Sequence, residues 1–186
     1  MIYEKTKFEG VYSLTPEIFE DSRGLFFESF NQEKFLAATG IDPDFIQDNV
    51  SHSKRGVLRG LHYQLPPYSQ AKLISVSKGN ITDFIVDLRP DSKTFTQHGT
   101  FELSDLNRKQ LYIPKGFAHG FFCSLDCVVQ YKVEGKYNPE VERTLRWDEP
   151  QFGFRKHTMW DEDYVIQSGK DKRGITMKEC VKEIKG

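Results

Sequence analysis

The feature that most constrains the fold is a series of short apolar segments, four to nine residues long, separated by turn residues. Segments of this length and spacing predict β-strands. Lys78-Gly79-Asn80 and Ser124-Leu125-Asp126 have the composition of turns between neighbouring strands. Many short strands at close spacing favour a sandwich or barrel over a parallel α/β sheet. The expected strands are Leu25–Phe30, Phe45–Ser53, Gly56–Gln64, Leu73–Ser77, Ile81–Leu88, Gly99–Leu103, Gln110–Ile113, Ala118–Cys123 and Cys127–Val133.

Two short helices are expected beside these strands. Asn31 is a favourable N-cap for a helix that ends near Gly40. Thr176 and Glu179 have the spacing of a capping box at the start of a C-terminal helix. A length of 186 residues, without repeats or low-complexity linkers, favours a single domain.

Charge and composition argue against several classes of partner. Lysine and arginine number 26 and aspartate and glutamate 27, and 26 − 27 = −1, so bulk charge does not favour nucleic-acid binding. An anionic ligand would have to be held by local cations. The first residues, MIYEKTKFEG, lack the pattern of a secretory signal, and no apolar stretch approaches the length of a membrane span. We therefore expect a cytoplasmic protein with no membrane and no nucleic-acid partner.

The three cysteines are Cys123, Cys127 and Cys180, and they form no Cys-x-x-Cys pair. An odd number of cysteines without a secretory signal fits reduced thiols. Cys123 and Cys127 flank a predicted turn, and we interpret them as small apolar residues of the core.

A β-barrel can hold one small ligand in its interior, and strand residues alternate inward and outward. In Cys127–Val133 the odd positions are mostly apolar, which points Tyr131 inward. By itself this pattern favours a core tyrosine whose hydroxyl is satisfied locally. Lys72 shares a face with Ile74 and Val76. It is either an inward lysine that is paired or used in chemistry, or a strand-end lysine that reaches solvent.

Two histidines lie in otherwise apolar surroundings. His62 is in a predicted strand, where an isolated histidine is more often a hydrogen-bonded core residue than a catalyst. Arg59 and His62 have opposite parity in a regular strand, so both can face the interior only if the strand bulges at Gly60. His119 follows a Pro-x-Gly turn and either contacts a ligand or locks that turn.

The main alternative hypothesis for these histidines is a metal site. Metal-binding barrels often place two histidines at positions i and i+2 of one strand, with further histidine or carboxylate ligands. The predicted strands contain no such pair, and His62 with His119 makes a poor ligand set, so we expect no metal. A glycine-rich phosphate loop is also missing, so a diphosphate would need arginines and lysines brought together by the fold.

Several motifs follow one another along the chain: DSRGLFFESF at 21–30, QDN at 47–49, GVLRGLHYQ at 56–64, QAKL at 70–73, VDLRPDSKTF at 86–95, LSDLNRKQLYIPKGFAHGF at 103–121, and Tyr131 followed by YNPEVE at 137–142. Taken together and in this order, they resemble one family, the dTDP-4-dehydrorhamnose 3,5-epimerases. The resemblance extends over nearly the whole chain. It implies a mostly β, cupin-type jelly-roll barrel with short flanking helices. It also implies one epimerase domain, residues 1–186, with a barrel core at about 45–150 and a C-terminal helical extension at about 160–186.

The resemblance also implies roles for individual residues. His62 matches the family's catalytic base, and Asp171 matches the carboxylate that pairs with it. Tyr131 matches the acid on the opposite face of the sugar, and Lys72 matches the residue near the enolate oxygen. The residues that match nucleotide-sugar contacts are Arg23, Glu28, Gln47, Asn49, Arg59, His119, Glu142 and Lys170.

The implied activity is the inversion of C3 and C5 of a nucleotide-linked 4-keto-6-deoxyhexose, without cofactor or metal. The expected reaction converts dTDP-4-keto-6-deoxyglucose to dTDP-4-keto-rhamnose through an enolate, in deoxysugar and cell-surface polysaccharide biosynthesis. A homodimer is also implied, in which Arg23 and Glu28 reach into the partner's site. The alternatives are a single-carbon (3- or 5-) epimerase acting on a related nucleotide sugar, and a metal-dependent or non-catalytic sugar-binding cupin. One stretch departs from the family pattern, because Phe152-Gly153-Phe154-Arg155-Lys156 stands where members usually carry a Trp-Pro segment.

Overall fold

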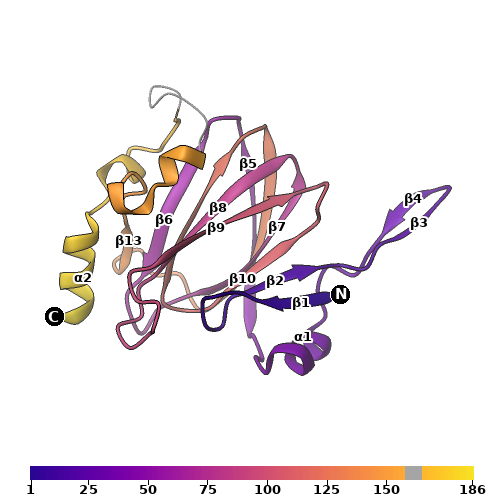
Figure 1. Cartoon of the computed structure of the whole chain (residues 1–186), viewed down its shortest axis with the longest axis horizontal. Helices are drawn as coiled ribbons and strands as arrows, with labels where there is room; N and C mark the ends of the chain where they lie inside the picture. The colour runs from indigo at the N-terminus through magenta and orange to yellow at the C-terminus, as the bar shows by residue number, and fades with distance from the viewer. Residues whose placement is uncertain (158–164) are drawn as a thin grey trace.

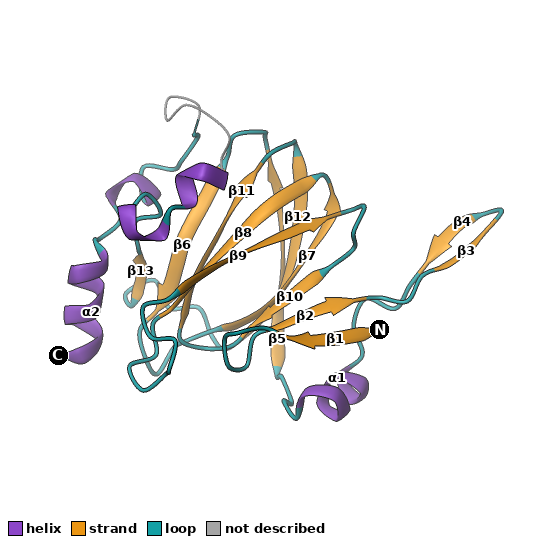
Figure 2. Ribbon diagram, viewed as in Figure 1, coloured by secondary structure: helices purple, strands orange, loops and turns teal. Residues whose placement is uncertain are grey.

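The structure, a computed structural model, describes residues 1–157 and 165–186. Two antiparallel β-sheets form the body of the molecule (Figures 1 and 2). The first sheet has six strands in the order β1 (Ile2–Lys5), β2 (Tyr12–Thr15), β10 (Gln110–Ile113), β7 (Ala71–Lys78), β12 (Cys127–Glu134) and β5 (Phe45–Ser53). The second has five strands in the order β13 (Glu142–Thr144), β6 (Leu58–Gln64), β11 (Phe117–Cys123), β8 (Asn80–Asp87) and β9 (His98–Ser104).

The chain passes repeatedly from one sheet to the other. Between β5 and β12 every connection crosses between the sheets except the β8–β9 hairpin. This alternation is the topology of a jelly roll, in which two sheets close around one interior. The predicted mostly β, cupin-type jelly-roll barrel with short flanking helices is confirmed.

Apolar side chains from both sheets fill much of the barrel interior. Ile74 and Val129 of the first sheet pack in one buried cluster with Ile85 and Phe121 of the second. Tyr131 is half-buried and packs against this cluster, as the alternation along its strand predicts.

A second buried cluster covers the outer face of the five-stranded sheet. It is formed with the C-terminal segment, which includes the short helices η1 (Pro150–Phe152), η2 (Phe154–His157) and η4 (Asp171–Arg173) and the helix α2 (Met177–Lys185). Phe154 stacks on Phe84 of β8 with ring centroids 4.4 Å apart. Because β8 is covered on both faces, its residues after Asn80 are all buried, which explains why its sequence does not alternate.

Both predicted helix caps are present. Asn31 accepts a hydrogen bond from Lys34 N at the start of α1 (Gln32–Thr39), and Gly40 ends that helix in the left-handed conformation. Thr176 and Glu179 form the capping box of α2. In the described part of the chain, no helix is long and apolar enough to cross a membrane.

Several short elements differ from the strand predictions. Leu25–Phe30 is wrong beyond Phe26, because the chain forms a two-stranded arm of β3 (Phe19–Asp21) and β4 (Gly24–Phe26) that projects from the body (Figure 1). Strands β1, β2 and β13 were not predicted, since each has only three or four residues and is fixed by its sheet partners. β1 and β2 extend the first sheet to residues before 45. The first residues of the C-terminal extension proposed at 160–186 lie outside the described residues.

Strand β6 bulges at Gly60, the position where the sequence would permit it. His119 pairs with His62 and Phe121 with Arg59, so three steps along β6 oppose two steps along β11. Gly60 has φ +110°, and a Cβ atom there would lie 2.7 Å from the Gly120 Cα atom. Glycine at both positions therefore allows the two strands to approach closely at the bulge.

Candidate active site

A cavity of about 280 Å³ lies between the first and second sheets and is lined by residues of β5, β6, β7, β12 and β13. Six of the predicted site residues line it: Gln47, Asn49, His62, Lys72, Tyr131 and Glu142. A small adjoining space is lined by His62 and Lys72 together with His119. The strand register accounts for this convergence, since Asn49 of β5 pairs with Tyr131 of β12.

His62 and Asp171 form a hydrogen-bonded pair at the wall of this cavity. His62 Nε2 lies 2.6 Å from Asp171 Oδ1, and the Asp171 side chain is 5% exposed. Burial by itself would raise the pKa of Asp171, but hydrogen bonds from His62, Ser168 and the Gly60 backbone hold it below its ordinary value. An ionised Asp171 that accepts from Nε2–H leaves the lone pair of the imidazole on Nδ1, which is the tautomer that a general base requires.

The C-terminal segment reaches this site through backbone pairing with β6. Ile166 O accepts from Leu58 N at 2.9 Å, and Ile166 N donates to Gly56 O at 2.8 Å. Ser168 Oγ then accepts from Asp171 N at 3.1 Å at the start of η4. The chain thus brings Asp171 to His62 without the Trp-Pro segment of the family pattern.

Tyr131 lies on the opposite sheet from His62. Burial raises the pKa of Tyr131, the positive charge of Arg59 lowers it in part, and Glu142 raises it further. The phenol is therefore protonated at neutral pH and is a hydrogen donor on the wall of the cavity that faces the imidazole.

Lys72 brings a positive charge to the same cavity. Burial lowers the pKa of Lys72, and the nearby carboxylates of Asp83 and Glu142 oppose that shift. The sequence left two alternatives for Lys72, an inward lysine that is paired or used in chemistry and a strand-end lysine that reaches solvent. Its place in the lining of the cavity fits the first alternative.

A second histidine–aspartate pair lies behind Lys72. His119 Nε2 is 2.8 Å from Asp83 Oδ2, and both side chains are buried. Burial raises the pKa of Asp83 and lowers that of His119, although each group partly offsets the shift of the other. Asp83 was not predicted as a site residue, yet an aspartate in the middle of the apolar segment Ile81–Leu88 is the signal that identifies it. The other aspartate of that segment, Asp87, lies near its end and pairs with Arg89.

Glu142 connects the cavity to two further side chains. Lys170 forms an ion pair with it, and Tyr137 Oη donates to Glu142 Oε2 at 2.7 Å. Burial would raise the pKa of Glu142, but these two partners hold it below its ordinary value. Tyr137 also lines the cavity and was not predicted, because it lies in a polar loop without strand periodicity. Gln64 orders this loop by donating to the carbonyl oxygen of Lys136 and accepting from Asn138 N.

Besides Lys170, three predicted contact residues line neither the cavity nor the adjoining space. Arg23 is on the projecting arm, 88% exposed, and pairs with Asp21. Glu28 pairs with Lys34 near α1 at 2.9 Å. Arg59 is exposed beside the cavity and donates from Nε to Ser53 Oγ at 3.0 Å.

The described residues, 1–157 and 165–186, contain no group of three or more histidine, cysteine, aspartate or glutamate side chains placed to hold a metal ion. The cavity itself brings together His62, Tyr131 and Lys72, side chains that can act as a base, an acid and a cation around a small ligand.

Comparison with known proteins identifies the family. The family model of dTDP-4-dehydrorhamnose 3,5-epimerase matches residues 5–179. The protein of that name from Methanothermobacter thermautotrophicus is 42% identical over 176 residues, which cover 94% of this chain and 94% of that protein. The crystal structure of dTDP-4-dehydrorhamnose 3,5-epimerase from Elizabethkingia anophelis NUHP1 matches with a TM-score of 0.89 at 40% identity and covers 96% of this chain and 97% of that chain.

A third match is RmlC, the dTDP-6-deoxy-D-glucose-3,5-epimerase of Legionella pneumophila Philadelphia 1. It has a TM-score of 0.84 at 39% identity and covers 93% of this chain and 90% of that chain. The present chain belongs to the dTDP-4-dehydrorhamnose 3,5-epimerase family, and its members are isomerases that epimerise sugars.

Proposed function

We propose that this protein inverts C3 and C5 of a nucleotide-linked 4-keto-6-deoxyhexose, with His62 as base and Tyr131 as acid. The observation that carries the proposal is the placement of the His62–Asp171 pair and Tyr131 on opposite walls of one cavity. A keto group at C4 acidifies the C–H bonds at C3 and C5, so a base with a pKa near neutrality can remove either proton.

Each inversion then requires two proton transfers on opposite faces of the sugar. The C–H proton passes to His62 Nδ1 while the bonding electrons move to the C4 oxygen and form an enolate. The Tyr131 hydroxyl donates its proton to the other face of the same carbon and becomes a phenolate. Solvent restores both groups before the next inversion.

The charge that develops on the C4 oxygen needs a hydrogen donor or a cation. Lys72 meets this need because it lines the same cavity as His62 and Tyr131. His119 lines the adjoining space and is held by Asp83. Loss of one such donor commonly lowers the rate by about 10²–10³.

The nucleotide part of the substrate is proposed from both the site and the relatives. Gln47, Asn49, Glu142 and Tyr137 supply polar groups and an aromatic ring at the cavity, with Lys170 behind them. The Legionella pneumophila relative has been solved in complex with dTDP-4-keto-L-rhamnose. We therefore propose a dTDP-linked substrate and a role in deoxysugar synthesis in the cytoplasm.

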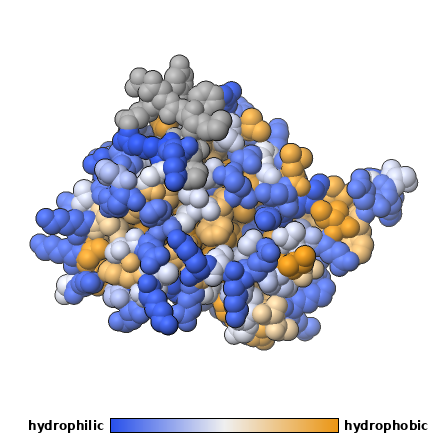
Figure 3. Space-filling view, viewed as in Figure 1, coloured by the Kyte–Doolittle hydropathy of each residue, from blue (hydrophilic) through white to orange (hydrophobic). Residues whose placement is uncertain are grey.

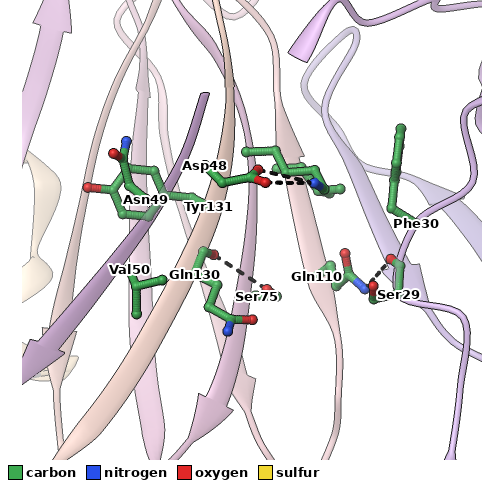
Figure 4. Close-up of a pocket in the computed structure, with 11 residues that line it drawn as sticks. Ser29, Phe30, Asp48, Asn49, Val50, Ser75, Gln110, Gln130 and Tyr131 are labelled. Atoms are coloured by element: carbon green, nitrogen blue, oxygen red, sulfur yellow. Dashed lines mark hydrogen bonds and ion pairs between the residues drawn. The ribbon is translucent and has the colours of Figure 1, made fainter. Parts of the chain in front are cut away.

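We propose that the active form is a homodimer. The arm exposes Phe19, Leu25 and Phe26, and apolar side chains gather where it joins the body (Figure 3). The outer face of the first sheet carries a hollow of about 300 Å³ beside exposed Val50, with Phe30 and Gln130 at its walls (Figure 4). Exposed apolar side chains of this kind are commonly covered by a partner surface. If that partner is a second copy of the chain, its arm would bring Arg23 and Glu28 to the neighbouring cavity.

Mixed dimers test this arrangement. Arg23→Ala and His62→Ala should each be inactive alone, whereas mixing the two proteins should restore activity in the site that combines intact His62 with the partner's Arg23. If the subunits exchange and the mixture still has no activity, the hypothesis of a shared site is contradicted.

The activity itself is tested by incubation with dTDP-4-keto-6-deoxyglucose in D₂O, with deuterium at C3 and C5 read by NMR. Deuterium and inverted configuration at both carbons are expected. The competing candidate is a single-carbon epimerase, because ChmJ of Streptomyces bikiniensis, a 3'-monoepimerase, matches with a TM-score of 0.82 at 28% identity, covering 96% of this chain and 94% of that chain. Inversion at one carbon alone would select that candidate.

A further inference from the structure

Cys123 and Cys127 form a close pair outside the proposed catalytic cavity. Cys123 is the last residue of β11 and Cys127 the first residue of β12, with the turn Ser124-Leu125-Asp126 between them. Their Sγ atoms are 2.7 Å apart, and the residues are 0% and 3% exposed. Since β11 and β12 belong to different sheets, a bond between these sulfurs would join the two sheets directly.

The two thiols have different surroundings. The hydrogen bond with Cys123 holds the pKa of Cys127 below its usual value, and the positive charge of Arg59 acts in the same direction, against burial and Asp126. The same hydrogen bond and burial raise the pKa of Cys123. Of the two thiols, Cys127 is therefore the more readily ionised, and the thiolate is the reactive form in disulfide exchange.

Cys127 is buried, but it is the member of the pair that lies nearer to the surface. It lines a surface hollow of about 240 Å³ together with His52, Lys54, Lys78 and Asp126, whereas Cys123 is not part of that lining. Lys54 is paired with Asp126 at 3.2 Å, and Lys78 adds a second positive charge at the rim. An anionic small molecule in this hollow would therefore lie closer to Cys127 than to Cys123, so Cys127 is the cysteine that it would meet first.

We infer that Cys123 and Cys127 are a dithiol that low-molecular-weight disulfides oxidise reversibly to an intramolecular disulfide. The Cys127 thiolate attacks one sulfur of the small disulfide, and the other half leaves as a thiolate. Cys123 then loses its proton and attacks Cys127 Sγ, which releases the second half. Two protein thiols are oxidised, the small disulfide is reduced to two thiols, and those thiols take up the two protons.

The inference goes beyond the proposed function and does not depend on it. Cys180 provides an internal comparison, because it is buried in the second cluster near α2, where burial raises its pKa to about 11. It has neither a neighbouring thiol partner among the described residues nor a place in the lining of the surface hollow.

The test uses the full chain, reduced and then incubated with oxidised glutathione. The intact mass should fall by two hydrogens, with no lasting glutathione adduct. Cleavage before Asp126 separates Cys123 from Cys127, so the two resulting peptides should stay joined in the oxidised sample and separate after treatment with dithiothreitol.

Three variants assign the roles. Cys123→Ser should stop at a mixed disulfide on Cys127, Cys127→Ser should stay unmodified, and Cys180→Ser should behave as the parent protein. A folded parent protein that stays reduced under conditions that oxidise the unfolded chain would overturn the inference. The inference would also be overturned if oxidised glutathione modified the Cys127→Ser variant as fast as it modifies the Cys123→Ser variant. If a serine variant fails to fold, the peptide map of the parent protein decides alone.

Discussion

The protein holds two histidine–aspartate pairs with similar geometry in different surroundings. The nitrogen–oxygen distance is 2.6 Å for His62 and Asp171 and 2.8 Å for His119 and Asp83. The His62 side chain is 30% exposed and the His119 side chain 7% exposed. The pairs also lie side by side, because His62 and His119 are direct partners between β6 and β11.

This difference in burial gives the two pairs different electrostatics. Hydrogen bonds keep the pKa of Asp171 low despite its burial, so the carboxylate is ionised beside a solvent-accessible imidazole. Burial shifts both His119 and Asp83 toward their neutral forms. The first pair is suited to accept a proton from a substrate, and the second to hold a neutral hydrogen-bonding group in place. Access to solvent, more than the distance within the pair, separates the two roles.

The largest expected effect is the difference in deuterium exchange between the variants that lack His62 and His119. His62→Ala should abolish deuterium exchange at both C3 and C5 while nucleotide binding survives, because the only proposed base is lost. His119→Ala should keep exchange at a reduced rate, since it removes a positioning or contact group. NMR in D₂O measures exchange, and calorimetry with dTDP measures binding. Undiminished exchange in His62→Ala would show that the base lies elsewhere.

Replacing Asp171 and Asp83, the carboxylates of the two pairs, should also affect catalysis unequally, with a smaller loss of activity than replacing the histidines. Asp171→Asn should lower kcat by up to about 10⁴, because the amide favours the wrong imidazole tautomer and cannot stabilise the imidazolium. Asp83→Asn should lower kcat by no more than about 10²–10³, as expected for disturbing one donor at the enolate oxygen. Steady-state kinetics on the two variants measures both effects. Equal losses would remove the distinction between a catalytic and a positioning pair.

Tyr131→Phe separates the two half-reactions. The ring keeps its packing against the core cluster, so the fold should survive. Inverted product should fall by about 10²–10⁴, the usual contribution of a general acid. Exchange through His62 should persist in at least one carbon, because removal and return of a proton on one face changes no configuration. Inversion of both carbons at the parent rate would make Tyr131 a core residue, and loss of exchange as complete as in His62→Ala would give it a positioning role.

Sequence patterns predicted the parts of the site that follow from strand alternation and turn chemistry. The period of two placed Tyr131 inward and put Lys72 on the same face as Ile74 and Val76, but it did not decide whether Lys72 is used in the interior or reaches solvent. Gly60 permitted the bulge beside His62. The helix caps at Asn31 and Thr176 followed from local hydrogen bonding, which needs no tertiary information.

The parts that alternation did not predict depend on contacts between distant segments. Asp171 is separated from His62 by more than a hundred residues, and only the resemblance to a family connected them. Tyr137 gains its position from Gln64, whose amide binds the backbone of its loop. Asp83 faces His119 because of the β8–β11 register, which one strand sequence alone does not specify.

The smallest effect should be seen in the pH dependence of stability. Burial holds the pKa of His119 below the value of about 6.5 expected in the unfolded chain. Below that pH the unfolded chain binds a proton that the folded protein does not. The stability contributed by neutral His119 is therefore complete above about pH 6.5 and is lost as the pH falls toward the folded pKa. The loss is at most about 1.4 kcal/mol for each pH unit that separates the unfolded pKa from the folded pKa.

His119→Gln removes this titration while it keeps a hydrogen donor for Asp83. The raised pKa of Asp83 has the opposite effect on the pH dependence of stability in the parent protein, because the folded state binds the Asp83 proton more tightly than the unfolded chain does. The stability that this proton contributes is lost as the pH rises from about 3.9 through the folded pKa. Urea unfolding of both proteins at pH 7.5 and 5.5 should show a smaller loss of stability on acidification for His119→Gln. Parallel losses would mean that His119 titrates alike in the folded and unfolded chains, and the distinction between an accessible and a buried pair would then rest on catalysis alone.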